Sequence, residues 1–386
     1  MRAYFYHTQN IQYILGKMEK GEFPAHFLYG ATKLGNHGID VIWHRSLTSA
    51  SRFRQMMHNL WQMAFVHRDY DVIYATHYQG IEPLIFLRAL GLFRRRIVLW
   101  HHQPIIVAQS FWRNWLGKLF YRGIDDMFFF SRKLIDDSVK AHKTDPSKFH
   151  LGHWGADLEM YDRVTAEKCV RHGFVSTGKE KRDMATLVRA FNQTGAPLNI
   201  YLNTKNGNFS YKKLFETLEL KDNIHVEFPD KLMPYELSKE VNKAQCVVIC
   251  CKETSYTVGL TTVVEALAMG LPMICSHNPQ IPVDIDGEQC GITVPYGDVE
   301  AWQRAITYMQ EHPDVSIVGG AMQEFNSKCS NLNVRHYPLT HDDVLHYIYK
   351  ACPLAHPTVM MRMSMFREGG LRYDERFRTS QDIALW

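Results

Sequence analysis

Long apolar runs, CxxC pairs and low-complexity segments are all missing from this chain of 386 residues. No apolar run approaches the roughly 20 residues that a membrane-spanning helix needs. The first residues, MRAYFYH, lack the apolar segment and the small-residue cleavage site of a signal peptide, so no secretory leader is expected. None of the eight cysteines belongs to a CxxC pair, and none of the 20 histidines to an HxxxH pair. We therefore predict no metal site.

What is present is the composition of an ordinary globular protein, with 46% apolar and 22% charged residues. The length favours two or three domains. All eight cysteines follow residue 168, and Cys246, Cys250 and Cys251 lie in one apolar run typical of a buried strand. Free thiols of this kind are common small core residues. We therefore expect reduced cysteines and a cytoplasmic protein.

The formal net charge of +4 hides an uneven distribution. Residues 1–150 contain 20 Lys and Arg against 11 Asp and Glu, a balance of +9, and the remainder has −5. Two interpretations stay open: an ordinary solvated surface, and peripheral contact with the anionic inner face of a membrane. No nucleic-acid module accompanies the basic half, so no nucleic-acid partner is expected. Much of the excess comes from Arg94, Arg95, Arg96, Arg113, Lys118, Arg122, Arg132 and Lys133.

Short apolar runs alternate with helical segments along the chain, which predicts parallel sheets covered by helices on both faces. The expected strands of a first sheet are 3–7, 40–44, 71–77, 96–102, 127–131 and 149–153, with helices at 52–66, 111–122 and 132–142. Those of a second are 173–177, 198–203, 223–228, 245–251, 271–276 and 291–294, with helices at 184–192, 234–244 and 261–270. Two doubly wound domains in tandem leave a cleft where ligands bind.

The most informative stretch of the second set runs from a strand through Gly259 into a helix. The free N–H groups of a helix N-terminus bind anions, and glycine lets a phosphate approach the backbone closely. Thr261 and Thr262 add hydroxyl groups at the same end. Glu265, about one turn further on, is placed to accept hydrogen bonds from a ribose diol.

A second cluster, Ser176–Asp183, also lies between a strand and a helix. Its Gly178, Lys179 and Arg182 stand where two cations reach a diphosphate and support its departure without a metal ion. Ordinary loop charges are the alternative for Lys179 and Arg182.

Together these segments resemble retaining glycosyltransferases of the GT-B fold, family-4 type, over roughly residues 1–305. The match continues in Gly291–Asp298. The resemblance implies that Lys179 and Arg182 contact the diphosphate, that Gly259, Leu260 and Thr261 form the phosphate-binding turn, and that Glu265 binds the ribose. It also implies a same-face mechanism in which the diphosphate assists deprotonation. The domains expected are 1–158 for the acceptor and 159–310 for the nucleotide-sugar donor.

The chain departs from the family at the sugar-binding acid, since Thr257 stands eight positions before Glu265 where a glutamate is common. The Gly-Gly loop after the first strand is absent as well. In the first domain, His102 ends a strand where the family frequently has a histidine near the transferred sugar. His101 and His77 are weaker candidates, and local hydrogen bonding is the alternative for these histidines.

Residues 311–386 resemble something different, a part of a family-2 glycosyltransferase of GT-A type, an α+β fragment. The matching segments are His312–Gly320, His356–Arg362, Gly369–Tyr373 and Gln381–Trp386, and Asp382 occupies the position of that family's general base. The metal-binding half of that family has no counterpart here, so we expect this segment to be catalytically silent.

The sequence therefore predicts a hexosyltransferase-type enzyme of polysaccharide biosynthesis. It would move a sugar with retention, without a metal or other cofactor, from a nucleotide-diphosphate sugar to a hydroxyl of a glycan or lipid-linked saccharide. An inactive nucleotide-sugar-binding or scaffold protein and a nucleotide-sugar epimerase on the same fold remain as alternatives.

Overall fold

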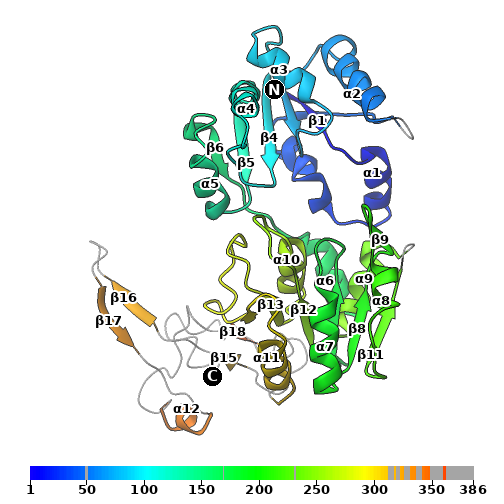
Figure 1. The fold of residues 1–386 in the computed structure, drawn as a ribbon, viewed down its shortest axis with the longest axis vertical. Coiled ribbons are helices and arrows are strands. Elements are labelled where there is room, and N and C mark those ends of the chain that lie inside the picture. Colours follow the sequence, from blue (N-terminus) through cyan, green and yellow to red (C-terminus); the bar gives the residue numbers. More distant parts are fainter. Residues whose placement is uncertain are drawn as a thin grey trace, which may run out of the picture.

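The computed structural model describes residues 1–47, 51–167, 169–229 and 232–311, with the short pieces 317–318, 322–325, 331–335, 341–347 and 360–361. The described residues form two domains, each built around a six-stranded parallel sheet. The first domain lies above the second in Figure 1.

The first sheet has the strand order β2-β1-β3-β4-β5-β6. Because β1 pairs with both β2 and β3, the direction in which strands are added reverses between β1 and β3. In open α/β sheets ligands bind at the carboxyl ends of the strands beside such a switch point. The strands are β1 Arg2–Tyr6, β2 Asp40–Trp43, β3 Val72–Ala75, β4 Arg96–His101, β5 Asp126–Phe129 and β6 Phe149–Leu151.

Helices cover this sheet, and several begin at a side-chain cap. Asn10 accepts the Tyr13 N–H and Ser131 accepts the Leu134 N–H, which satisfies donors that the first turn leaves free. The helical segments are α1 Ile11–Glu19, η1 Ala25–Leu28, η2 Ala31–His37, α2 Arg52–Trp61, the π-turn η3 Gln62–Val66, α3 Glu82–Ala89, α4 Phe111–Arg122, α5 Arg132–Val139 and η4 Pro146–Lys148.

The second sheet has the order β11-β8-β7-β12-β13-β14, with its switch point between β7 and β12. The strands are β7 Phe174–Thr177, β8 Leu198–Tyr201, β11 Ile224–Glu227, β12 Cys246–Ile249, β13 Met273–Ser276 and β14 Gly291–Val294; β9 Lys205–Asn206 and β10 Phe209–Ser210 form a hairpin. The helices are α7 Met184–Thr194, α8 Tyr211–Phe215, α9 Pro234–Asn242, α10 Leu260–Ala268 and α11 Val299–Glu311.

Helix α6 (Leu158–Ala166) joins the two sheets and packs on α9 and α10. One buried apolar cluster runs from the first sheet through Met160 and Tyr161 into the second. The Gln280 side-chain amide also donates to Asp137 across the domain boundary, at 3.1 Å. Packing and direct hydrogen bonding therefore both connect the domains.

The expected fold class, two Rossmann-like parallel sheets, is confirmed. Several strands end earlier than expected; β3, for example, ends at Ala75 rather than at residue 77. The reason is that the residues at the carboxyl ends leave the sheet to form the loops of the candidate site. Helix α4 has the expected bounds.

The segments compared with a GT-A enzyme, including Asp382, lie mostly outside the described residues. The described pieces there are β15 Ile317–Val318, β16 Met322–Phe325, β17 Asn331–Arg335, α12 His341–Tyr347 and β18 Met360–Met361. Within the described ranges, no helix has the length and apolar content that crossing a bilayer requires.

Gly123, at the end of α4, gives a test of the packing of the first domain. A Cβ added there would overlap the backbone carbonyl of Ile85 in α3, and neither backbone segment can yield cheaply. Gly123→Ala is expected to lower the free energy of unfolding by about 1–3 kcal/mol, measured by urea unfolding. Gly16→Ala is the control, because a Cβ there meets nothing within 4 Å; equal stability of both variants would contradict the α3–α4 packing.

Candidate functional site

Arg182 occupies the centre of the loops at the switch point of the second sheet. Its side chain is 4% exposed. Nε donates to the Thr177 carbonyl at 2.8 Å and Nη2 to the Thr262 hydroxyl at 3.0 Å, while Nη1 lies 3.1 Å from Cys251 Sγ. The guanidinium therefore links β7, the end of β12 and the first turn of α10.

No ion pair among the described residues includes this guanidinium. A fully buried cation without a carboxylate partner is costly, because its hydration is lost and not replaced by an opposite charge. Gly178 lies directly over Arg182 with a φ of +102°, and a Cβ there would overlap Nη2. The loop after β7 is thus shaped around a buried positive charge.

Helix α10 begins at Gly259, whose φ of +95° is accessible mainly to glycine. Leu260 is buried in the core, Thr261 is exposed, and Thr262 is buried against Arg182. The free N–H groups of the first turn and the guanidinium are therefore neighbours, and both favour an anion. This is the geometry that the sequence predicts for a phosphate-binding turn, with Leu260 contributing its backbone only.

Lys179 lies on the loop between Gly178 and Arg182 and is exposed. Glu180 beside it accepts a hydrogen bond from the Tyr256 hydroxyl at 2.7 Å. That contact ties the loop after β7 to the loop after β12. Lys179 is free to turn toward a ligand, whereas Arg182 is fixed.

Three imidazoles stand at the carboxyl ends of neighbouring strands of the first sheet: His7 after β1, His77 after β3 and His102 after β4. The His77 and His102 ring centroids are 5.5 Å apart. His102 Nε2 donates to the Thr76 carbonyl at 2.8 Å, so Nδ1 keeps a free lone pair. The Glu180 carboxylate of the second domain is close enough to favour protonation of His102 and so to oppose the lowering of its pKa by burial.

The imidazoles of this group are held neutral by their surroundings. Burial lowers the pKa of His7 and of His77 to about 4, and the neighbouring His102 adds to both shifts. Burial also lowers the pKa of His102, although its bond to Thr76 and the Glu180 carboxylate oppose the shift. Burial lowers the pKa of His101 to about 4 as well, but both of its ring nitrogens are already bonded, to the Gln103 carbonyl and the Tyr121 hydroxyl.

Glu265 lies at the domain boundary rather than in open solvent. Its carboxylate is 3.7 Å from His26 Nε2 of the first domain, and its side chain is 25% exposed. His26 Nδ1 accepts the Asp157 N–H at 3.1 Å, so Nε2 carries the proton that faces Glu265. Burial and the same carboxylate raise the pKa of the Tyr161 hydroxyl. A ribose diol at Glu265 would therefore share the carboxylate with groups that the sequence did not reveal.

A pocket of about 520 Å³ lies at the switch point of the first sheet. It opens between the ends of β1 and β3 and the helices α2 and α3. Its lining combines polar and apolar surface: the polar side chains include Thr8, Arg52, Gln55, Asn59, Gln79 and Glu82, and Phe53 and Met56 are apolar.

Sequence reasoning missed His26, His7 and this pocket. His7 carried a usable signal, because it follows a buried strand in the same way as His102. His26 carried none, since it lies in η1, a short helical turn far from any motif.

Comparison with known proteins bears on the fold and on the class of protein. Residues 169–312 match the family model of glycosyl transferases group 1, which covers the Arg182 and Gly259 loops. The search of curated proteins found no match to the sequence.

Among solved structures, Anabaena Alr3699/HepE in complex with UDP is 14% identical, with a TM-score of 0.54 over 81% of this chain and 91% of that one. A glycosyltransferase from Rickettsia africae is also 14% identical, with a TM-score of 0.53 over 80% and 88%. Sucrose-phosphate synthase from Thermosynechococcus elongatus is 12% identical, with a TM-score of 0.55 over 81% and 90%. The fold is thus that of GT-B glycosyltransferases, and the family match supports the same class.

The lowered pKa of His7 predicts a pH effect on stability. In the unfolded chain the imidazole takes up a proton below about pH 6.5, but in the folded protein only near pH 4. The unfolded state therefore binds more protons in this window, and stability falls as the pH falls. In His7→Asn, whose amide oxygen can still accept the Gln9 N–H, the slope should be smaller by up to about 1.4 kcal/mol per pH unit.

Urea unfolding between pH 8 and pH 4, in roughly half-unit steps, measures this effect. Above pH 7 the variant and the wild type should show the same slope, which serves as the internal control. An unchanged slope below pH 6.5 would show that His7 is protonated as readily in the folded protein as in the unfolded chain.

Proposed function

We propose that this protein is a retaining, metal-independent glycosyltransferase that moves a sugar from a nucleotide-diphosphate donor to a hydroxyl acceptor. The observation that carries the proposal is the buried, unpaired guanidinium of Arg182 beside the N-terminus of α10. A diphosphate would supply the missing negative charge.

We assign to Arg182, Lys179 and the first turn of α10 the stabilisation of negative charge on the leaving diphosphate. When the bond between the anomeric carbon and the diphosphate breaks, negative charge grows on the diphosphate. Arg182 and the N–H groups after Gly259 are already oriented toward it and need no reorganisation, which is the source of their catalytic value. Lys179 adds a mobile cation. These groups do the work that a metal ion does elsewhere, so no cofactor is proposed.

The acceptor hydroxyl attacks the anomeric carbon on the face that the diphosphate leaves. Its proton passes to the departing diphosphate oxygen, which preserves the configuration and needs no enzymic carboxylate under the sugar. The family commonly has a sugar-binding glutamate at the position of Thr257, and its absence here agrees with a mechanism that uses no carboxylate of the protein. His102 lines the sugar site from the first domain, with its Nδ1 lone pair free to accept a sugar hydroxyl.

The donor base and the acceptor follow from weaker arguments. Alr3699/HepE is described in complex with UDP-glucose, which makes uridine diphosphate the first nucleotide to test, with Glu265 as the ribose acid. The polar pocket between β1 and β3 fits a glycan or lipid-linked saccharide, and such an acceptor suits polysaccharide biosynthesis in the cytoplasm, where the six described cysteines stay free thiols.

Nucleotide binding tests the proposal most directly. At a concentration 100 times its dissociation constant, a uridine nucleotide should stabilise the protein by about 2.7 kcal/mol, seen as a rise in melting temperature. Arg182→Gln should abolish this rise, because the buried cation is lost, and Glu265→Gln should reduce it. EDTA should leave it unchanged.

Arg189→Gln is the matched control, since Arg189 is exposed on α7 and its loss should leave the nucleotide effect intact. No shift with any nucleoside diphosphate would refute the donor site. A shift without turnover on any acceptor would favour an inactive binding protein. The presence of Thr257, where the family commonly has a glutamate, is compatible with that outcome. Appearance of a C2 epimer without an acceptor would favour an epimerase.

His102 has its own test. His102→Ala removes a hydrogen-bond acceptor for the sugar but none of the groups around the diphosphate, so nucleotide binding should persist. Transfer, measured as kcat/KM, should fall about 10- to 100-fold. Equal losses of binding and transfer would show that His102 supports the fold instead.

A further inference from the structure

Helix α4 turns an apolar face to the solvent. None of its twelve residues is buried, and Phe111, Trp112 and Trp115 are 75%, 69% and 51% exposed. Leu116 is exposed as well, and the loop before the helix adds Ile106 and Val107. We call Phe111, Trp112, Trp115 and Leu116, with these two loop residues, the α4 surface. Exposed patches of this kind mark interaction sites.

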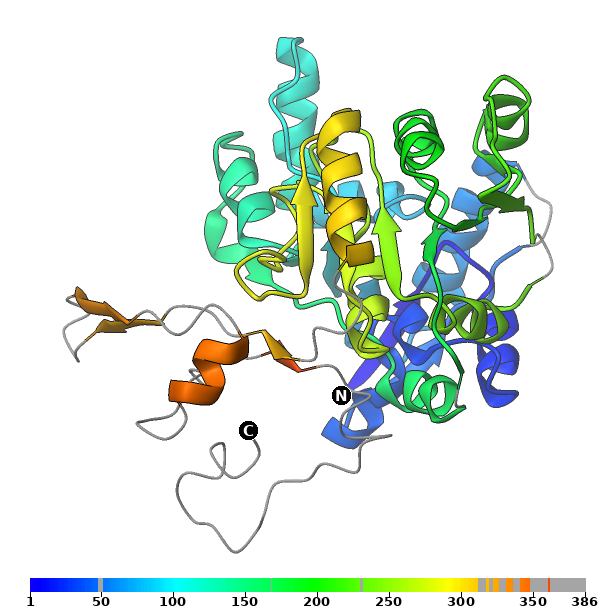
Figure 2. The same ribbon diagram turned by 90° about the horizontal axis from the view of Figure 1, so that it is seen from below.

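The opposite side of the helix holds it to the protein. The Phe120 ring packs edge-on against Tyr78 and Phe86. Asn114, in the first turns, bonds the Ala108 backbone in both directions. The exposed stripe, with its i, i+4 spacing from Phe111 to Trp115 and from Trp112 to Leu116, is therefore a stable feature of a well-anchored helix. Figure 2 shows α4, in turquoise, projecting from the edge of the first domain.

Basic side chains flank the stripe, and α4 contains no acidic residue. Arg113 lies beyond one border of the stripe and Lys118 beyond the other, while Arg122 follows Phe111 and Trp115 on the same face in the last turn, as their positions around the helix require. All three are exposed. Apolar and aromatic residues bordered by cations are the pattern of helices that lie in the interface of a bilayer.

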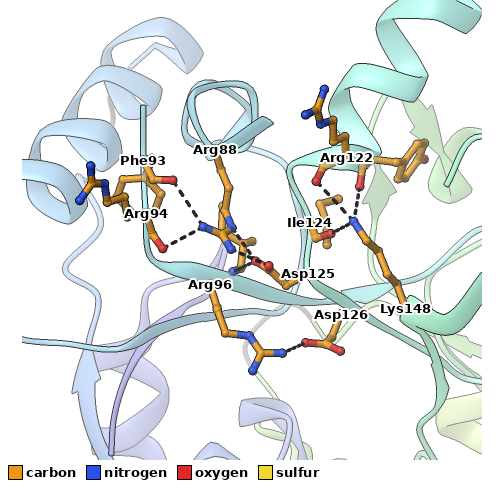
Figure 3. Close-up of polar contacts among 11 residues, drawn as sticks. Arg88, Phe93, Arg94, Arg96, Arg122, Ile124, Asp125, Asp126 and Lys148 are labelled. Atoms are coloured by element: carbon orange, nitrogen blue, oxygen red, sulfur yellow. Dashed lines mark hydrogen bonds and ion pairs between the residues drawn. The ribbon is translucent and has the colours of Figure 1, made fainter. Parts of the chain in front are cut away.

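The two acids that follow α4 in the sequence, Asp125 and Asp126, are paired with cations of the first domain, as Figure 3 shows. Arg88 binds Asp125 through two bonds of 2.6 Å, and Arg96 binds Asp126 at 2.7 Å. Lys148 donates to the carbonyls at the end of α4, including that of Ile124 at 2.6 Å. The Arg122 side chain points away from this network. The positive charge of Arg122 is therefore available to a partner outside the domain.

We propose that the α4 surface is a membrane-docking site that inserts its aromatic side chains among anionic lipids while Arg113, Lys118 and Arg122 contact the headgroups. Tryptophan and phenylalanine supply the apolar contact, and long basic side chains reach the phosphate level. A second copy of this chain fits less well, because contact between two such surfaces would bring the positive charges of both copies close together. An anionic bilayer is the complementary occupant.

The surface is connected to the candidate site by a short stretch of chain. The loop that carries Ile106 and Val107 starts at His102, at the end of β4. A protein docked through α4 would hold this edge of the first domain, and the carboxyl end of β4, close to the lipid headgroups. Resting on the proposed function, the inference makes the acceptor a lipid-linked saccharide rather than a free glycan.

Vesicle flotation of the full chain tests the docking site. Wild type is expected to float with vesicles of phosphatidylglycerol and phosphatidylcholine, and less with phosphatidylcholine alone. Trp112→Ser with Trp115→Ser should weaken binding at least about tenfold, because the inserted apolar area is lost. Arg113→Gln with Lys118→Gln and Arg122→Gln should weaken binding to anionic vesicles about fivefold for each cation.

Trp61→Ser is the matched control, since Trp61 is 54% exposed on α2, which lies apart from α4 in Figure 1. It should bind vesicles as the wild type does. Unfolding in urea and the nucleotide-induced rise in melting temperature should be unchanged in the double tryptophan variant, which separates failure of docking from failure of the fold or of the donor site.

Three outcomes would overturn the proposal. The first is the absence of wild-type binding to anionic vesicles. The second is binding that the double tryptophan variant retains, which would make it purely electrostatic. The third is a wild-type dimer in sedimentation that the same variant abolishes, which would make a second copy the occupant of the α4 surface.

Discussion

The candidate donor site depends on one buried positive charge. The Arg182 guanidinium bonds the end of β7, the end of β12 and the first turn of α10, so it joins the loops on both sides of the switch point. This position imposes constraints on its neighbours: Gly178 must lack a side chain, and Thr262 must offer an oxygen. Because burial of an unpaired cation is costly, the same group that organises the loops would also favour the binding of an anion beside it.

The first domain reaches the same region through a second set of contacts. Asp157 caps α6 and bonds the backbone of η1, and His26 of η1 faces Glu265 of α10. If Glu265 binds a ribose, one carboxylate serves both the donor and the domain boundary. Donor binding would then be coupled to the arrangement of the two domains, because any change at the carboxylate would alter its interactions with His26 and Tyr161.

The fold, and the positions of Arg182 and Gly259 in the candidate site, could be predicted from the sequence because their signals are local. Alternating apolar strands and helices define both sheets, and a parallel sheet places its chemistry at the carboxyl ends of its strands. Gly259 and Arg182 follow such ends directly. The sequence could not reveal His26 or the partner of Glu265, because these contacts join residues more than 200 positions apart and depend on how two domains pack. The sequence shows that Arg182 is positively charged, but it does not show that the side chain is buried.

Helix α4 shows a different limit of sequence reasoning. Its apolar residues recur with the helical period, and that period predicted its bounds correctly. The same pattern ordinarily means that the apolar stripe faces the core. Here the side of Phe120 and Asn114 faces the protein instead, because the ring contacts with α3 and the bonds to the preceding loop fix the rotation of the helix. Periodicity identifies an apolar face but not what covers it, and for α4 the proposed contact with an anionic membrane rests on the cations around the apolar stripe.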